Sequence, residues 1–262
     1  MRLAVFDIDG TLIGYNTFTL QNSTVKALKM LKNQGVILSL ATARAVNMLD
    51  ENLLSNIEFD YYICLNGSYA VDKKGKEIFR EKMPTEDIEK LLEEMKAKNY
   101  AISVHYTREH YAYYGADKLS LLWTVPGEKE NIIFPDRTEY NRYKREAAVS
   151  ATVYVPDNEI DEIRSRYPLF KFVKLQSNFY DVVMKNSGKG VALRKIREQL
   201  KIERNETIAF GDGNSDIDMI CEAGVGVAMG NAVPELKEAA DYITKEVTDD
   251  GIYYALKNLK II

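Results

Sequence analysis

The sequence predicts an α/β fold, in which an α+β domain is inserted into a Rossmann-like, doubly wound parallel sheet. Short apolar runs alternate with amphipathic segments at the start of the chain, which is typical of parallel strands covered by helices. Within residues 82–182 the order changes to helices separated by pairs of strands, which indicates an antiparallel sheet. The first alternation then returns. We therefore expect a discontinuous core formed by residues 1–81 and 183–262, with residues 82–182 as the inserted domain.

The first part of the core begins with an apolar run at residues 3–6, which stops at acidic residues and so predicts a buried strand. Ser23 precedes an amphipathic stretch that ends at Gly35, which predicts a helix capped by this serine. The next predicted elements are a strand, a helix and a strand, at residues 36–41, 45–55 and 61–65.

The same patterns predict the rest of the chain. In the inserted domain we expect helices at residues 86–98 and 158–166 and strands at residues 101–105, 111–114, 148–155, 170–175 and 180–184. In the second part of the core we expect a helix at residues 190–200, a helix that ends near Gly224, and strands at residues 207–210, 225–228 and 241–244.

Composition and charge exclude several classes of protein. With 262 residues, 46% of them hydrophobic, the chain is long enough to bury a substantial core. A net charge of −4, with acids and bases interleaved, provides no basic surface for a nucleic-acid polymer. The longest apolar runs are far too short to span a membrane, and the early acids Asp7 and Asp9 leave no room for a signal peptide. We expect a cytoplasmic protein in which Cys64 and Cys221 are small buried residues.

Asp7 and Asp9 directly follow the first predicted strand. Residues two apart on a strand project to the same side, so both carboxylates can converge on one site. Ligands of doubly wound sheets gather outside the carboxyl ends of the strands, which is where this pair falls. A divalent cation with oxygen ligands would offset the repulsion between the two acids. An Asp-x-Asp pair alone can be a solvated turn, but the preceding strand and the following Gly-Thr favour a site.

A second acidic cluster follows the predicted strand at residues 207–210 and opens a helix. Asp212 comes directly after that strand between two glycines, so we predict that it binds a metal ion at the same end of the sheet. The alternative is a turn in which Ser215 caps the helix and Asp216 and Asp218 interact favourably with its N-terminus. For Asp218 we prefer that alternative.

Two further features are suited to a phosphate group. Residues 41–44, Ala-Thr-Ala-Arg, end the second predicted strand and offer a hydroxyl and backbone N–H groups at a predicted helix start. Lys189 lies in the first turn of its predicted helix, where a cation opposes the helix dipole and a bound anion would remove the conflict. A capping threonine and a solvated lysine are the alternative interpretations.

Together and in this order, the motifs resemble those of the haloacid dehalogenase superfamily, in particular its Cof-type, sugar-phosphatase-like members. The matching segments are FDIDGTL at residues 6–12, LATAR at 40–44, KGVAL at 189–193 and FGDGNSDIDM at 210–219, with smaller matches at Asn66-Gly67 and at residues 225–232. The resemblance covers essentially the whole chain. It implies that residues 82–182 form a cap domain of type C2 (IIB), which closes over the active site and sets specificity.

The resemblance implies a phosphatase that forms an aspartyl phosphate. Asp7 would be the nucleophile, and Asp9 would protonate the leaving group and then take a proton from water. Mg²⁺ would be held by the Asp7 side chain, the Asp9 backbone carbonyl and Asp212, with support from Asp216. The phosphoryl group would be held by Thr42 and Lys189, and by backbone N–H groups near Ile8, Asp9 and Ala43.

Two residues depart from the family pattern. Ala43 stands where glycine is usual and would narrow the phosphate loop, and Ser215, a candidate phosphate contact, stands where asparagine is usual and reaches less far. Neither departure removes a charge, so we expect activity to survive. Arg44 and Asn66 are further candidates for contacts with the substrate or the cap.

The substrate is expected to be a small soluble phosphate ester, and the family favours sugar phosphates. The inserted domain holds His105, His110, Trp123 and many tyrosines, which either contact a substrate or pack within the domain. Two other functions remain open. A phosphomutase would share the nucleophile and the acid, and a non-catalytic phospho-acceptor or metabolite-binding module would place similar acids at strand ends. The sequence does not indicate an oligomeric state.

Overall fold

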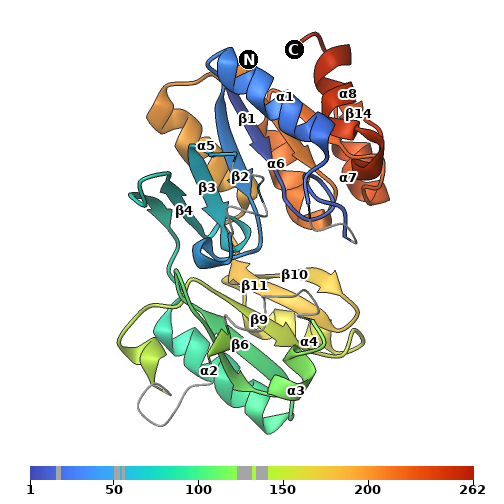
Figure 1. The fold of residues 1–262 in the computed structure, drawn as a ribbon. Helices are drawn as coiled ribbons and strands as arrows, with labels where there is room; N and C mark the ends of the chain where they lie inside the picture. The colour runs from blue at the N-terminus through green and yellow to red at the C-terminus, as the bar shows by residue number, and fades with distance from the viewer. Residues whose placement is uncertain (16–18, 50–53, 55–56, 123–131, 134–140) are drawn as a thin grey trace. The chain divides into compact units, whose positions relative to one another are not determined.

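The computed structural model describes residues 1–15, 19–49, 54, 57–122, 132–133 and 141–262 (Figure 1). The chain divides into two compact units. The first comprises Met1–Arg44, Leu49–Phe79 and Gly188–Ile262, and the second comprises Ala45–Met48 and Arg80–Ser187. The second unit therefore interrupts the first along the chain.

The first unit is built on an eight-stranded sheet. From edge to edge its strands are β14 (Tyr242–Ile243), β13 (Val225–Ala228), β12 (Thr207–Gly211), β1 (Leu3–Phe6), β2 (Ile37–Ala41), β3 (Tyr61–Cys64), β4 (Tyr69–Asp72) and β5 (Glu77–Arg80). Neighbours from β14 to β3 are parallel, and β4 runs antiparallel to β3. The sheet is therefore mixed and mostly parallel, which confirms the predicted α/β class.

Helices cover both faces of this sheet. One face packs on α1 (Asn22–Asn33) and α8 (Gly251–Asn258), and the other packs on α5 (Lys189–Leu200), α6 (Ile217–Glu222) and α7 (Pro234–Ala239). The side chains of β1 alternate between the two cores, so every residue of this strand is fully buried. Short 3₁₀ turns complete the unit at Leu65–Gly67, Arg204–Glu206, Asn214–Asp216 and Val247–Asp249.

The second unit contains a six-stranded sheet. Its strand order is β10 (Phe170–Gln176), β11 (Phe179–Met184), β9 (Ser150–Tyr154), β6 (Ala101–His105), β7 (His110–Tyr114) and β8 (Ile132–Ile133). All neighbours are antiparallel except β7 and β8, which are parallel. The unit also contains α2 (Thr85–Ala97), α3 (Ala116–Leu119), α4 (Ile160–Arg166) and 3₁₀ turns at Val46–Met48 and Arg142–Lys144.

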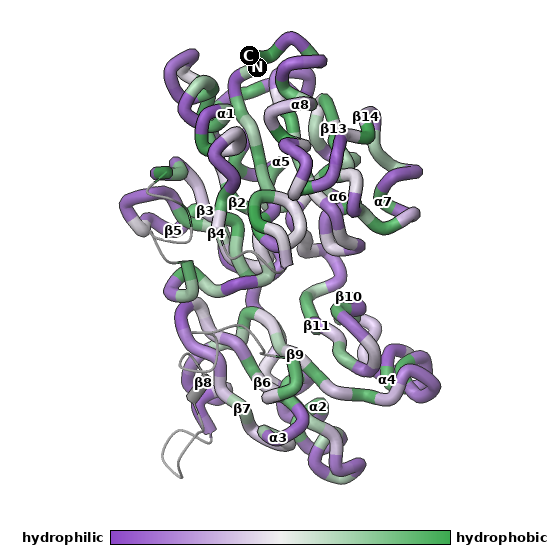
Figure 2. Tube along the Cα trace, turned by 45° about the vertical axis from the view of Figure 1, so that its right-hand side comes forward, coloured by the Kyte–Doolittle hydropathy of each residue, from purple (hydrophilic) through white to green (hydrophobic). Residues whose placement is uncertain are grey.

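The two faces of the second sheet differ in polarity. One face forms an apolar core with α2 and α4, and this core includes Tyr106, Tyr111 and Tyr113, which therefore pack within the unit. The other face carries buried polar side chains, among them His105 and His110, whose rings stack 3.9 Å apart. The hydrophobic stretches of the chain coincide with the strands, whereas the outer turns are mostly hydrophilic (Figure 2). Trp123 lies outside the described residues.

Several local predictions were wrong. In place of the helix expected at residues 45–55, the described part contains one 3₁₀ turn at Val46–Met48, and residues 50–53 and 55–56 lie outside the described residues. Helix α1 is preceded by Gln21 rather than capped by Ser23, whose hydroxyl instead donates a hydrogen bond to Asp250.

Other parts of the first unit were not predicted or differ from expectation. The sequence patterns did not predict the β4–β5 edge or helices α7 and α8. Cys64 is buried as expected, but Cys221 is exposed near the end of α6, because it falls outside the apolar stripe of that helix. Within the part of the chain that the structure describes, no helix has both the length and the apolar character needed to cross a membrane.

Candidate active site

Three adjacent parallel strands end at the same edge of the first sheet. The register pairs Phe6 of β1 with Phe210 of β12 on one side and with Leu40 of β2 on the other. Asp7 continues directly from β1, and its backbone N–H donates a hydrogen bond to the Phe210 carbonyl (3.0 Å). Asp212 directly follows β12 in the same way. The carboxyl ends of central strands thus bring acids from distant parts of the sequence together.

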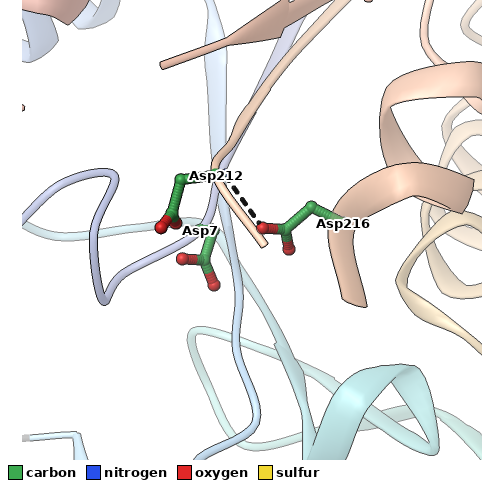
Figure 3. Close-up of side chains that lie close together, drawn as sticks. All are labelled: Asp7, Asp212 and Asp216. Carbon is green, nitrogen blue, oxygen red and sulfur yellow. Dashed lines mark hydrogen bonds between the residues drawn. The ribbon is translucent and has the colours of Figure 1, made fainter. Parts of the chain in front are cut away.

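Asp7, Asp212 and Asp216 form a compact group of carboxylates (Figure 3). One carboxylate oxygen from each residue lies within 4.8 Å of the others, and the residues are only 6%, 4% and 1% exposed. Asp216 is held by the loop after β12, because its Oδ2 accepts hydrogen bonds from the backbone N–H groups of Asp212 (3.1 Å) and Gly213 (3.0 Å). Its Oδ1 is then directed to a second partner.

That partner is Lys189, the first residue of α5. Its Nζ donates hydrogen bonds of 2.6 Å to Oδ1 of Asp7 and of 2.6 Å to Oδ1 of Asp216, and the residue is only 1% exposed. The predicted phosphate-binding lysine is therefore a buried ion-pair partner of two acids. The solvated-lysine alternative is wrong.

Burial and mutual repulsion perturb the ionisation of this group. The pKa of Asp7 is raised well above its ordinary value, first by burial and then by the charge of Asp216, although Lys189 opposes this shift. Burial and the charge of Asp216 raise the pKa of Asp212 to about 6. Burial alone would lower the pKa of Lys189, but the charges of Asp216 and Asp7 raise it above its ordinary value. The site therefore favours additional positive charge.

Asp212 is oriented by two hydroxyl groups. Thr11 Oγ1 donates to Oδ1 of Asp212 (3.0 Å), and the Tyr15 hydroxyl donates to Oδ2 (2.9 Å). Gly10 is required beside them, because its φ is +86° and a Cβ there would lie 2.1 Å from Asp212 Oδ2. Sequence reasoning missed Tyr15, for which the only signal was its proximity to the first acidic motif.

Asp9 does not join the group of three acids. Strand β1 ends at Phe6, so the strand alternation that was expected to align Asp7 with Asp9 does not apply. Ile8 between them is fully buried, and its carbonyl accepts a hydrogen bond from Leu12 N–H (2.9 Å), which turns the chain. The carboxylate of Asp9 instead pairs with Arg44 in a two-pronged contact of 2.8 and 2.9 Å.

The segment after β2 differs from the expected helix-start anion site. Thr42 is buried, its N–H donates to the Ile63 carbonyl (2.8 Å), and its Oγ1 accepts from the N–H of Arg44 (3.1 Å). The first helical residue of the next turn is Val46, so no helix begins at Thr42. Ala43 is exposed, and its backbone lies outside the left-handed region.

The remaining predicted residues lie around this edge. Ser215 is part of the 3₁₀ turn that ends at Asp216. Asn66 is buried with a φ of +51°, and its N–H donates to the Thr42 carbonyl (3.0 Å). Sequence reasoning did not single out Asn231, although it lies in a matching run. Its Nδ2 donates to the Gly10 carbonyl (2.8 Å) and fixes the first acidic loop.

Comparison with known proteins gives consistent results over the whole chain. Residues 4–256 match the family model for haloacid dehalogenase-like hydrolases. YkrA of Bacillus subtilis (strain 168) is 31% identical over 261 residues, covering 100% of this chain and 98% of the relative. The 5-amino-6-(5-phospho-D-ribitylamino)uracil phosphatase YcsE of the same organism is 26% identical, covering 98% and 95%. A solved subclass IIB sugar phosphatase is 25% identical with a TM-score of 0.88, and all of both chains is covered.

Proposed function

Because the chain belongs to the family of haloacid dehalogenase-like hydrolases, we propose that it is a Mg²⁺-dependent phosphatase that hydrolyses small phosphate monoesters. The observation that carries the proposal is the buried group of Asp7, Asp212 and Asp216 with Lys189 between two of them. Three carboxylates face one ammonium group, so an ionised site retains two negative charges. Such a site suits a divalent cation and a reaction whose transition state is stabilised by charge.

The donor set fits Mg²⁺. Carboxylate oxygens are hard ligands, and this ion prefers a few of them together with water and substrate oxygens. Burial and the negative charge of Asp216 raise the pKa of Asp212 to about 6, so the site favours a proton on this carboxylate. A bound divalent ion would replace that proton. Asp7, Asp212 and Asp216 would hold the ion, with the Asp9 carbonyl as a further proposed ligand. When bound, the ion would neutralise charge on the phosphoryl oxygens.

We propose the following roles for the other residues. We assign Asp7 as the nucleophile: its carboxylate oxygen attacks phosphorus, the bond to the ester oxygen breaks, and Asp9 protonates the departing alkoxide. Water then attacks the aspartyl phosphate, its proton passes to Asp9, and Asp7 is released. Lys189 holds Asp7 Oδ1 in place and offsets part of the phosphate charge. Thr42, Ser215 and the N–H groups near Ile8 and Ala43 are proposed phosphate contacts.

We propose sugar phosphates and related polyol phosphates as the substrate class, with the second unit acting as the specificity-setting cap. The support comes from the substrates in the names of two relatives. One is a phosphatase of a phosphorylated ribityl compound, and the other is a sugar phosphatase. Both substrates are phosphate monoesters of polyhydroxylated carbon chains.

The test is phosphate release from a panel of sugar phosphates, polyol phosphates, nucleotides and cofactor phosphates, with Mg²⁺ or with chelator. We expect metal-dependent turnover that Asp7→Asn reduces by at least about a thousandfold, the scale on which loss of a nucleophile acts. Asp161→Asn, which alters an aspartate whose side chain is 90% exposed, is the matched control.

Three results would contradict the proposal. Full activity of Asp7→Asn would exclude the aspartyl-phosphate route. Phosphoryl transfer to a second position of the substrate, without release of phosphate, would indicate a phosphomutase. A stable phosphoryl group on the protein without turnover would indicate a phospho-acceptor module.

A further inference from the structure

The backbone of Arg44 is held in place at the carboxyl ends of strands β2 and β3. Its backbone N–H donates to Thr42 Oγ1 (3.1 Å), and its carbonyl accepts a hydrogen bond from Leu65 N–H (3.1 Å). The first contact ties it to the segment after β2, and the second ties it to the end of β3. The position from which the Arg44 side chain extends is therefore fixed by two neighbouring strands.

The guanidinium group of Arg44 binds the carboxylate of Asp9 through two hydrogen bonds. Nε donates to Oδ2 (2.9 Å) and Nη2 donates to Oδ1 (2.8 Å), so each carboxylate oxygen has its own donor. This planar arrangement fixes the orientation of the carboxyl group as well as its position. A lysine at position 44 would preserve the charge but could not reproduce the two-pronged geometry.

The two partners differ in exposure. The side chain of Arg44 is 10% exposed, whereas that of Asp9 is 42% exposed. The buried arginine is thus the fixed partner and the carboxyl group the accessible one. Because the Asp9 side of the pair is open to water, the pair contributes only modestly to stability, and its two-pronged geometry orients the carboxyl group.

We infer that Arg44 is a positioning residue for Asp9 in the proposed phosphatase reaction, rather than a phosphate-binding residue. The inference rests on the proposed function, in which Asp9 gives a proton to the ester oxygen and later takes one from water. Nε and Nη2 of Arg44, the pair of donors that would bind a phosphate side-on, already bind Asp9, so a phosphate bound in that way would have to displace the carboxylate. Holding Asp9 in one orientation assists both proton transfers, because small misplacements of a reacting group are costly.

The test compares two leaving groups in Arg44→Lys and Arg44→Met. A primary alkyl phosphate, such as a hexose 6-phosphate, needs a proton on its leaving oxygen, whereas 4-nitrophenyl phosphate does not. For the alkyl substrate we expect kcat to fall by about tenfold or more in Arg44→Lys, with KM nearly unchanged. With 4-nitrophenyl phosphate, the rate of the rapid first release of nitrophenolate should stay close to that of wild type. The later steady-state rate should fall, because hydrolysis of the aspartyl phosphate still needs Asp9 to take a proton from water.

Arg194→Lys is the matched control, because Arg194 is half-exposed and pairs with Glu222 away from the site. Unfolding temperatures and inhibition by orthophosphate should be unchanged in Arg44→Lys, which separates positioning from misfolding or lost phosphate binding. An equal rise in KM for both substrates would assign Arg44 to the phosphate instead, and an unchanged kcat for the alkyl substrate would remove any role. If wild type itself shows no metal-dependent turnover, the proposed function fails and this inference fails with it.

Discussion

Replacing Lys189 by methionine should destabilise the first unit. The substitution removes the ammonium group that contacts both Asp7 and Asp216 while keeping a flexible apolar chain of similar length. Because all three residues are almost completely buried, water cannot replace the lost contacts. In chelator at pH 7 we expect the free energy of unfolding to fall by about 3–5 kcal/mol, the usual cost of removing one partner of a buried ion pair.

The cost of protonation gives the same magnitude. A carboxyl group with the ordinary pKa of 3.8 can be protonated at pH 7 for about 4 kcal/mol and at pH 5 for about 2 kcal/mol. The variant can relieve one buried charge in this way, so its loss of stability should shrink as the pH falls. The raised pKa of Asp7 gives the same direction of pH dependence. A raised pKa means that the folded state binds the proton more tightly than the unfolded state, so stability is lost as the pH rises.

Urea and thermal unfolding at pH 7 and pH 5 would measure the effect. The midpoint temperature at pH 7 should fall by roughly 10 °C relative to wild type, and by less at pH 5. Lys29→Met, which changes an exposed lysine of α1, is the control. Mg²⁺ should stabilise Lys189→Met more than wild type, because the site has lost a positive charge. Equal stability of the two methionine variants in chelator at pH 7 would refute the reasoning.

Two further predictions concern buried ionisable groups. Asp212→Asn should raise the stability of the metal-free protein at pH 7 by about 1–3 kcal/mol, because burial and Asp216 raise the pKa of Asp212 to about 6 and its ionised form therefore opposes folding. Thermal unfolding in chelator would measure this gain in stability, and added Mg²⁺ should no longer stabilise the variant. An Asp212→Asn variant less stable than wild type would contradict the prediction. Burial lowers the pKa of His110 to about 4, so the neutral ring is favoured in the folded state and stability is lost as the pH falls from about 6.5 toward 4. His110→Phe, which keeps a ring against His105, should lose less stability than wild type over that interval in urea unfolding; an equal loss would argue against a role for this titration.

The fold could be predicted where local pattern and tertiary context agree. The fully apolar run of β1 and the periodic segment that became α5 were identified because burial on one or two faces leaves a clear pattern in the sequence. The β4–β5 edge was missed because each strand has only four residues, Tyr-Ala-Val-Asp in β4 and Glu-Ile-Phe-Arg in β5, and neither alternates apolar with polar residues. Among the described residues of the helix expected at residues 45–55, only a 3₁₀ turn at Val46–Met48 forms, because apolar spacing alone does not specify a helix that lacks caps.

The candidate site was predictable in composition but not in pairing. Strand ends placed Asp7 and Asp212 at one edge, since parallel strands bring their carboxyl ends together. No sequence pattern showed that Lys189 would bridge Asp7 and Asp216, because that contact depends on how α5 packs beside the sheet. The same holds for Arg44 and Asp9, whose pairing needs the loop after β1 to turn at Ile8.

The two departures from the family pattern have different physical consequences. Ala43 was expected to narrow a loop that usually has glycine, but it adopts no left-handed backbone and is exposed, so the alanine methyl group causes no conformational strain. Ser215 lies in a turn whose position is already set by Asp216, which accepts two backbone hydrogen bonds. The acidic group therefore keeps its geometry without an asparagine at position 215. A shorter side chain there affects only the reach of one proposed phosphate contact, so the charge balance on which the chemistry depends is preserved.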